Sequence, residues 1–191
     1  AGLICVVLAT GCSVLHPRNP LPAASVGKAN VPGYSGIRDW GDHFSPVLQR
    51  SVEAALRTEA VLASGSVQKP IQYLSLSGGG MNGSFGAGLL CGWSEHGSRP
   101  QFDFVTGISA GALLAPFAFL GPEQDSALRE IHANLTPADL FRRKGVLRIL
   151  RDDSALDTAP LRELLKRYVT PGFVAAVARE HARGRRLWIG T

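Results

Sequence analysis

Two glycine-rich turns, each placed directly after a short apolar run, constrain the fold of this chain more than any other feature. The first turn covers residues 78–83 and follows residues 71–76, and the second covers residues 107–111 and follows residues 102–105. A segment of small and apolar residues follows each turn and is compatible with a helix. The repeated order of strand, tight turn and helix predicts an α/β fold, with both turns at the edge where neighbouring parallel strands end.

The second turn reads Gly-Ile-Ser-Ala-Gly over residues 107–111. A serine on so tight a turn adopts a strained backbone conformation, and a side chain two residues before or after it would collide with the neighbouring strand or helix. Gly107 and Gly111 remove those side chains. The Ser109 hydroxyl is then exposed near a helix N-terminus, whose dipole favours developing negative charge. Ser109 is therefore the candidate nucleophile, against the alternative that Gly-x-Ser-x-Gly arises by chance in a glycine-rich loop.

The first turn begins with three glycines, Gly78, Gly79 and Gly80, and continues to Gly83. Such a loop brings backbone N–H groups close to a ligand, which an anion or an oxyanion needs. The spacing also matches a dinucleotide-binding fingerprint, but Asp103, at about the distance of the acidic residue in that motif, starts the next strand instead of ending it. A phosphate-binding P-loop would need a lysine that this stretch lacks. A nucleotide-binding module is therefore kept only as a minor alternative.

Together, the two turns resemble the patatin-like phospholipase family. In that family a glycine-rich loop supplies the oxyanion hole, a Gly-x-Ser-x-Gly elbow supplies the nucleophile, and an aspartate in a later Asp-Gly motif completes a Ser–Asp dyad without histidine. The resemblance implies a three-layer α/β/α fold with a mainly parallel sheet. It also implies serine-dependent hydrolysis of a lipid acyl ester, of the phospholipase A or esterase type. By resemblance, Ser109 is the nucleophile, and the oxyanion loop comprises Gly78, Gly79, Gly80 and Gly83.

Two positions depart from the family pattern. Asn82 stands where many members carry a basic residue, and none of the aspartates in the chain is followed by glycine. Because residues 187–191 read as a strand, we expect the chain to continue beyond Thr191, with the catalytic aspartate there and residues 1–191 alone inactive. His96, the only histidine near the turns in sequence, would suit a Ser-His-Asp triad, but its place before Gly97 is typical of a solvated helix cap. A catalytically inactive, membrane-anchored interaction protein is the second hypothesis.

The N-terminal residues predict a lipid anchor. Residues 1–10 are almost wholly apolar and uncharged, too short to span a bilayer but suited to a secretion signal. The stretch from Leu8 to Cys12 resembles a bacterial lipoprotein processing site, which would leave Cys12 lipidated and the domain at a membrane surface; an ordinary signal peptide is the alternative. The predicted location is the bacterial cell envelope, at the periplasmic side of the outer membrane. The predicted parts are a partial signal peptide (1–11), a lipidated tether and extended arm (12–44) and the N-terminal part of the hydrolase domain (45–191).

Residues 122–185 are expected to form a helical insertion that covers the site as a lid. Between Arg142 and Arg186 the chain has twelve Lys or Arg against five Asp or Glu, so this segment carries +7, more than the +5 of the whole chain. Solvated helix faces and a patch for anionic lipid headgroups are the two interpretations left open. No aromatic-interleaved motif indicates nucleic acid, and no cluster with ligand spacing implies a metal or cofactor. Cys91, within residues 89–93, is interpreted as a core residue on a buried side of a helix.

Overall fold

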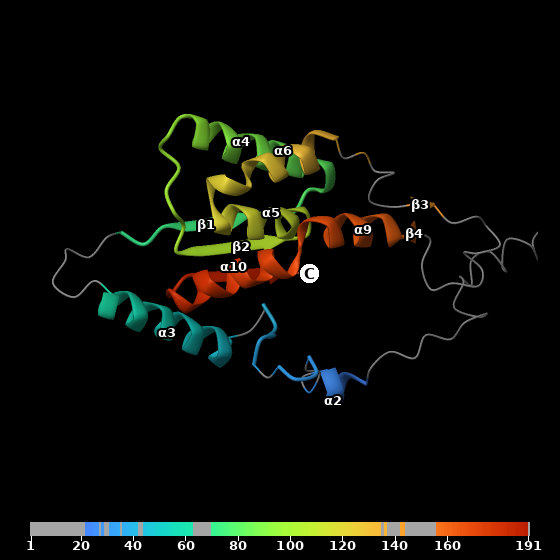
Figure 1. The fold of residues 1–191 in the computed structure, drawn as a ribbon. Coiled ribbons are helices and arrows are strands. Elements are labelled where there is room, and N and C mark those ends of the chain that lie inside the picture. The colour runs from blue at the N-terminus through green and yellow to red at the C-terminus, as the bar shows by residue number, and fades with distance from the viewer. Residues whose placement is uncertain are drawn as a thin grey trace, which may run out of the picture.

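The described part of the chain is a mixed α/β domain (Figure 1). The computed structural model describes residues 22–26, 28, 31–34, 36–41, 44–62, 70–134, 136, 142–143 and 156–190. The predicted signal peptide and Cys12 lie outside these residues, so lipidation stays a prediction.

The sheet contains three parallel strands in the order β1-β2-β5. These strands are β1 (Tyr73–Leu76), β2 (Phe104–Ile108) and β5 (Arg186–Gly190). Leu76 at the end of β1 lies opposite Gly107 on β2, so these two strands end almost level. Because parallel strands end at the same edge of a sheet, both glycine turns emerge side by side. The predicted parallel arrangement is thereby confirmed.

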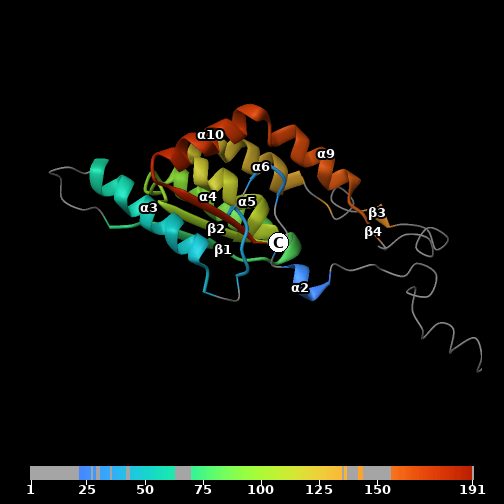
Figure 2. The same ribbon diagram turned by 90° about the horizontal axis from the view of Figure 1, so that it is seen from below.

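Helices lie on both faces of the sheet, as in the predicted three-layer α/β/α fold (Figures 1 and 2). The helices α4 (Gly83–Glu95), α5 (Ala110–Leu120) and α6 (Asp125–Asn134) lie on one face, and α3 (Pro46–Leu62) lies on the other, where it contacts β5. A second, two-stranded antiparallel sheet joins β3 to β4. The remaining elements are α2 (Ala23–Val26), η2 (Gly80–Asn82), η3 (Pro122–Gln124), β3 (Arg142–Arg143), β4 (Leu156–Asp157), α9 (Ala159–Tyr168) and α10 (Pro171–Ala182).

The helix α3 begins directly after Ser45, whose side chain caps it. The Leu48 N–H donates to Ser45 Oγ at 3.0 Å, and the Ser45 hydroxyl donates to the Asp39 carboxylate. Such a cap satisfies one of the unpaired N–H groups of the first turn. The helix is joined to the sheet through Arg186 of β5, whose Nε donates to Ser51 Oγ at 2.9 Å.

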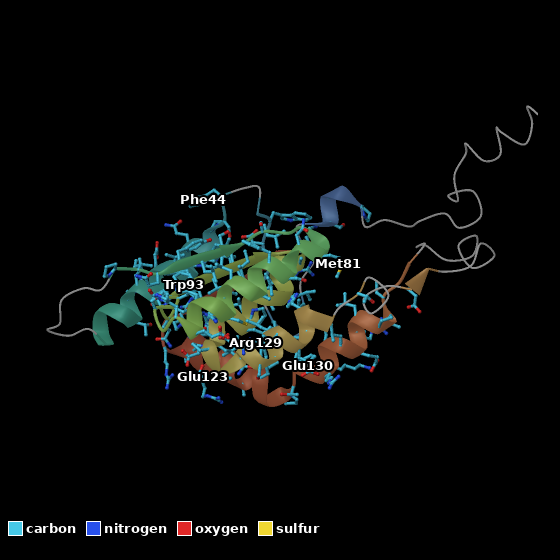
Figure 3. All side chains as sticks on the ribbon, turned by 90° about the horizontal axis from the view of Figure 1, so that it is seen from above. Phe44, Met81, Trp93, Glu123, Arg129 and Glu130 are labelled. Carbon is cyan, nitrogen blue, oxygen red and sulfur yellow. The ribbon has the colours of Figure 1, made fainter. Side chains whose placement is uncertain are left out.

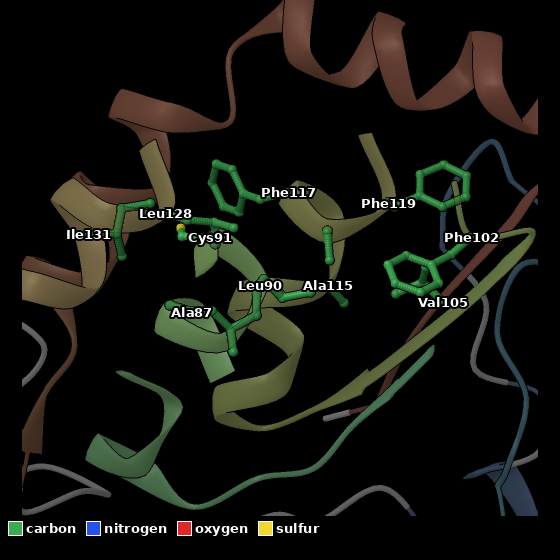
Figure 4. Packing of buried hydrophobic residues seen from close by; sticks show 12 residues of the cluster. Ala87, Leu90, Cys91, Phe102, Val105, Ala115, Phe117, Phe119, Leu128 and Ile131 are labelled. Atoms are coloured by element: carbon green, nitrogen blue, oxygen red, sulfur yellow. The ribbon is translucent and has the colours of Figure 1, made fainter. Parts of the chain in front are cut away.

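The apolar core lies between the sheet and the helices α4, α5 and α6 (Figure 4). Val105 of β2, Phe119 of α5 and Leu128 of α6 are each 0 % exposed. The helix α6 belongs to the stretch predicted as an insertion, so part of that stretch completes the core. The assignment of a lid stays a prediction. Within the stretch predicted as a helical insertion, residues 142–143 form a strand instead.

A buried arginine, Arg185, joins three segments of the domain immediately before β5. Its guanidinium lies 4.3 Å from the centre of the Phe119 ring and donates to the Phe119 carbonyl and, at 2.7 Å, to the Phe102 carbonyl. It also pairs with Glu180 of α10 at 2.8 Å. Burial acts to raise the pKa of Glu180, but the hydrogen bonds and charges of Arg185 and Arg183 outweigh burial and lower that pKa.

We expect Arg185→Met to lower the free energy of unfolding by about 2–4 kcal/mol, because it leaves the Phe102 and Phe119 carbonyls without their side-chain donor and removes the less exposed of the two cations that pair with Glu180. Arg183→Met is the matched control, since Arg183 pairs with the same carboxylate but its side chain is 69 % exposed. The control substitution should lower the free energy of unfolding by less than about 1 kcal/mol. Urea unfolding of the two variants measures both losses, and equal losses would contradict the structural role given to Arg185.

Candidate active site

The strained turn expected from the sequence is present between β2 and α5. Ser109 has φ 54° and ψ −118°, and it is the only residue other than glycine with positive φ among those that the structure describes. This conformation is sparsely populated and costs on the order of 1–3 kcal/mol. The Ser109 side chain is exposed at the carboxyl edge of the sheet. Its backbone N–H donates to the Gly190 carbonyl at 3.3 Å, which fixes the end of β5 beside the turn.

The two glycines that flank the serine allow a close approach that no side chain would permit. A Cβ atom on Gly107 would lie 2.7 Å from the Ala115 Cβ of α5. A Cβ atom on Gly111 would lie 2.7 Å from the carbonyl carbon of Leu76 and 2.8 Å from the Ser77 oxygen, at the end of β1. These separations are far below van der Waals contact. The collisions with a neighbouring helix and strand that the sequence predicts are therefore confirmed.

The first glycine turn lies against the Ser109 side chain. A Cβ atom on Gly78 would lie 3.1 Å from Ser109 Cβ and 3.7 Å from Ser109 Oγ. Gly79 and Gly80 have φ values of 147° and 56°, a region that side chains rarely adopt. The structure thus brings the backbone of the predicted oxyanion loop beside the predicted nucleophile.

Two helices begin at this same place. A Cβ atom on Gly83, the first residue of α4, would lie 3.3 Å from the Ala110 Cβ at the start of α5. Unpaired backbone N–H groups and the helix dipole make each N-terminus favourable for negative charge. The surroundings of the Ser109 hydroxyl are therefore suited to an anion that forms during a reaction.

The structure adds a histidine that the sequence analysis missed. Because α6 packs on α4, His132 Cε1 lies 3.7 Å from the position of a Cβ atom on Gly83. The His132 Nε2 atom is buried and has no hydrogen-bond partner in the part of the chain that the structure describes. Burial lowers the pKa of this imidazole, so it stays neutral at neutral pH. The sequence offers one signal: His132 stands four residues after the core residue Leu128 on the same helix.

Other titratable residues near the turns in sequence have structural roles. His96 ends α4, and its Nδ1 atom lies 2.8 Å from Ser98 Oγ, as expected of an exposed helix cap. Asp103 accepts a 2.7 Å hydrogen bond from the Gln72 N–H. That contact lies at the start of the strands, away from the glycine loop, which argues against a role for Asp103 in nucleotide binding. Asp152 and Asp153 lie outside the described residues.

Cys91 is a free, buried cysteine of the core, as predicted. Burial and the charge of Asp125 raise its pKa. It lies on a buried side of α4 with Ala87 and Leu90, as predicted, whereas Leu89 of the same stretch is 57 % exposed. Among the described residues, no three His, Cys, Asp or Glu side chains stand together as metal ligands. Over the same ranges, none of the helices has the length and apolar character needed to cross a bilayer.

We expect Ser109→Gly to have a higher free energy of unfolding than Ser109→Ala, by about 1 kcal/mol. Both substitutions delete the hydroxyl, but only glycine adopts the positive φ of this turn without strain. Urea unfolding of the pair isolates the backbone contribution. An alanine variant that is as stable as the glycine variant would mean that the turn holds no strain.

The comparisons with known proteins agree with this geometry. The model of the patatin-like phospholipase family matches residues 74–185, more than half of the chain. The matched region contains both glycine turns and Ser109. No curated protein and no solved structure matches the chain. The length of the family match shows that this chain belongs to the patatin-like phospholipase family.

Proposed function

We propose that this protein is a serine-dependent lipid acyl hydrolase, of the phospholipase A or esterase type, with Ser109 as its nucleophile. Membership of the patatin-like phospholipase family supports a hydrolase that acts on lipid. The observation that carries the proposal is the contact between the first glycine loop and Ser109, whose hydroxyl would lie 3.7 Å from a Cβ atom on Gly78. A strained, exposed serine beside two helix N-termini is an arrangement suited to acyl transfer.

In the proposed reaction, Ser109 Oγ attacks the carbonyl carbon of the ester while a carboxylate base takes the hydroxyl proton. N–H groups of the loop from Gly78 to Gly83, with that of Ala110, hold the oxyanion. Each donor of this kind contributes about 3 kcal/mol, and a positioned base contributes about 100- to 10,000-fold. Collapse of the intermediate breaks the ester C–O bond, and the alcohol leaves with the proton. Water then attacks the acyl-serine and releases the fatty acid.

An aspartate is the proposed base, and we place it beyond Thr191, as the family resemblance implies. The position of β5 supports this choice, because the chain leaves the strand at Gly190, whose carbonyl accepts the Ser109 N–H. Residues that follow β5 thus start close to the elbow. A Ser–Asp dyad would leave His96 and His132 without a part in proton transfer.

We expect the full-length protein to react with a fluorophosphonate probe and to hydrolyse acyl esters, and Ser109→Ala to lose both properties. The loss of turnover should be about a thousandfold or more, since the nucleophile is removed. Ser77→Ala is the matched control, because Ser77 is an exposed serine directly before the glycine loop. If the unmutated protein is neither labelled nor active, the hydrolase proposal fails and a lipid-anchored interaction protein becomes the better account.

We also expect kcat/KM to persist at mildly acidic pH, because a carboxylate base stays ionised well below the pKa of histidine. The pH–rate profile of the full-length protein measures this. Burial lowers the pKa of His132. The acid limb of the profile alone would therefore not distinguish a His132 base from a carboxylate base. The profile is therefore repeated with His96→Gln and His132→Gln. Loss of activity in either variant at every pH, with its fold intact, would refute the dyad.

A further inference from the structure

The outward face of α4 is apolar and carries no charge. No Asp, Glu, Lys, Arg or His occurs from Pro70 to Ser94. Phe85 is 77 % exposed, Leu89 is 57 % exposed and Met81, in the turn before the helix, is 40 % exposed. Their spacing of four residues puts them on one side of the helix. A helix that faced only water would carry polar residues on that side.

The C-terminal half of this face is hollowed. Gly88 and Gly92 leave open space, since a Cβ atom on either would have no neighbour within 4 Å. Together with Leu89, Trp93 and His96 they line a shallow, mainly apolar hollow of about 640 Å³. The Trp93 indole N–H donates to Ser98 Oγ at 3.1 Å, so its polar atom is satisfied while the ring borders the hollow. Met81 and Trp93 mark the two ends of the face (Figure 3).

The face continues directly from the candidate active site. Met81 belongs to η2, the turn that joins the glycine loop to α4. The same loop contacts Ser109 through Gly78. An ester that reached Ser109 from a lipid surface over α4 would therefore pass along an apolar face that has no charged residue from Met81 to Trp93.

We propose that the α4 face, formed by Met81, Phe85, Leu89 and Trp93, docks on the lipid surface that holds the substrate. This inference rests on the proposed function, because it specifies that the substrate of that site is lipid assembled in a surface. The strength of such docking scales with the apolar area that is buried at the boundary of headgroups and acyl chains. Because the face has no charge, its attraction to the surface comes from apolar burial and does not require anionic headgroups.

The size and charge of the face favour a lipid surface over a second copy of the chain. The helix has 13 residues and is about 20 Å long, so a stripe about 10 Å wide presents on the order of 200 Å². A stable protein interface buries about 800 Å² on each partner. From Met81 to Trp93 the chain also carries no charged residue that could contribute to the polar rim of a protein interface.

The test measures binding of the full-length protein to sedimenting vesicles of phosphatidylcholine, with and without phosphatidylglycerol, at low and high salt. Every variant also carries Cys12→Ser, so that acylation at that position makes no contribution. We expect Phe85→Ser with Leu89→Ser to weaken binding to both vesicles about tenfold or more, because apolar burial is lost. The matched control is Phe44→Ser, an equally exposed phenylalanine (79 %) before α3 and apart from α4 (Figure 3). It should bind normally.

Three results would overturn the inference. The double variant could bind vesicles as the unmutated protein does, or no vesicle binding could be found. If binding needs phosphatidylglycerol and disappears at high salt, docking would be assigned to the basic segment between Arg142 and Arg186 instead. A lower molecular mass of the double variant in sedimentation equilibrium would assign the face to a second copy.

The same experiment separates this inference from the proposed function. Ser109→Ala should bind vesicles normally, because docking needs no catalysis. The double variant should hydrolyse a soluble short-chain ester at the unmutated rate while its turnover of vesicle lipid falls with its binding. If turnover of the soluble ester depends on Ser109 but vesicle binding is unchanged in the Phe85 and Leu89 double variant, the docking face is refuted and the hydrolase proposal stands. If vesicle binding depends on Phe85 and Leu89 but the protein hydrolyses no ester, the hydrolase proposal is refuted and the docking face stands.

Discussion

The close approach of α5 to the end of β1 is the contact on which the rest of the domain depends. Gly111 lies so near the Leu76 carbonyl and the Ser77 oxygen that no other residue fits there. Because α5 starts against the sheet, its buried residues reach the core, and α4, α6 and α10 pack on it in turn. The same approach forces the tight turn in which Ser109 has a positive φ. The packing of α5 in the core and the strained conformation of Ser109 therefore have the same cause.

The strain at Ser109 persists because the surrounding structure holds both sides of the turn. On the strand side, β2 is hydrogen-bonded to a parallel neighbour along each edge. On the helix side, Phe117 and Phe119 of α5 are almost wholly buried. Full burial of one such aromatic ring contributes about 1.5–3 kcal/mol, so the helix alone offsets a strain of about 1–3 kcal/mol. Arg185 adds a further restraint, since it binds the carbonyl of Phe119 and the main chain before β2.

Local chemistry explains which features the sequence predicts. The two turns, the strands before them and the helices after them depend on glycine spacing and apolar runs within a few residues, so the sequence indicates them directly. The position of His132 depends on how α6 packs against α4, and no local pattern encodes that contact. Residues 89–93 of α4 are predicted to lie on a buried side of the helix, but Leu89 faces outward and is 57 % exposed. Because α4 has no charged residue before Glu95, its faces differ little in polarity, so periodicity does not tell which side meets the core.

The composition of α4 answers two requirements at once. On its inner side small residues allow close packing, since a Cβ atom on Gly86 would lie 3.1 Å from Leu114 Cδ1 of α5. That packing holds Gly83, and with it the end of the glycine loop, against the start of α5. On its outer side the same uncharged stretch exposes Phe85 and Leu89, although this lowers the solubility of the domain. A polar outer face would hold the loop equally well, so packing at the elbow does not explain the exposed apolar side chains. Docking on lipid does explain them, and it would bring the substrate to the helix whose first residue lies beside the elbow.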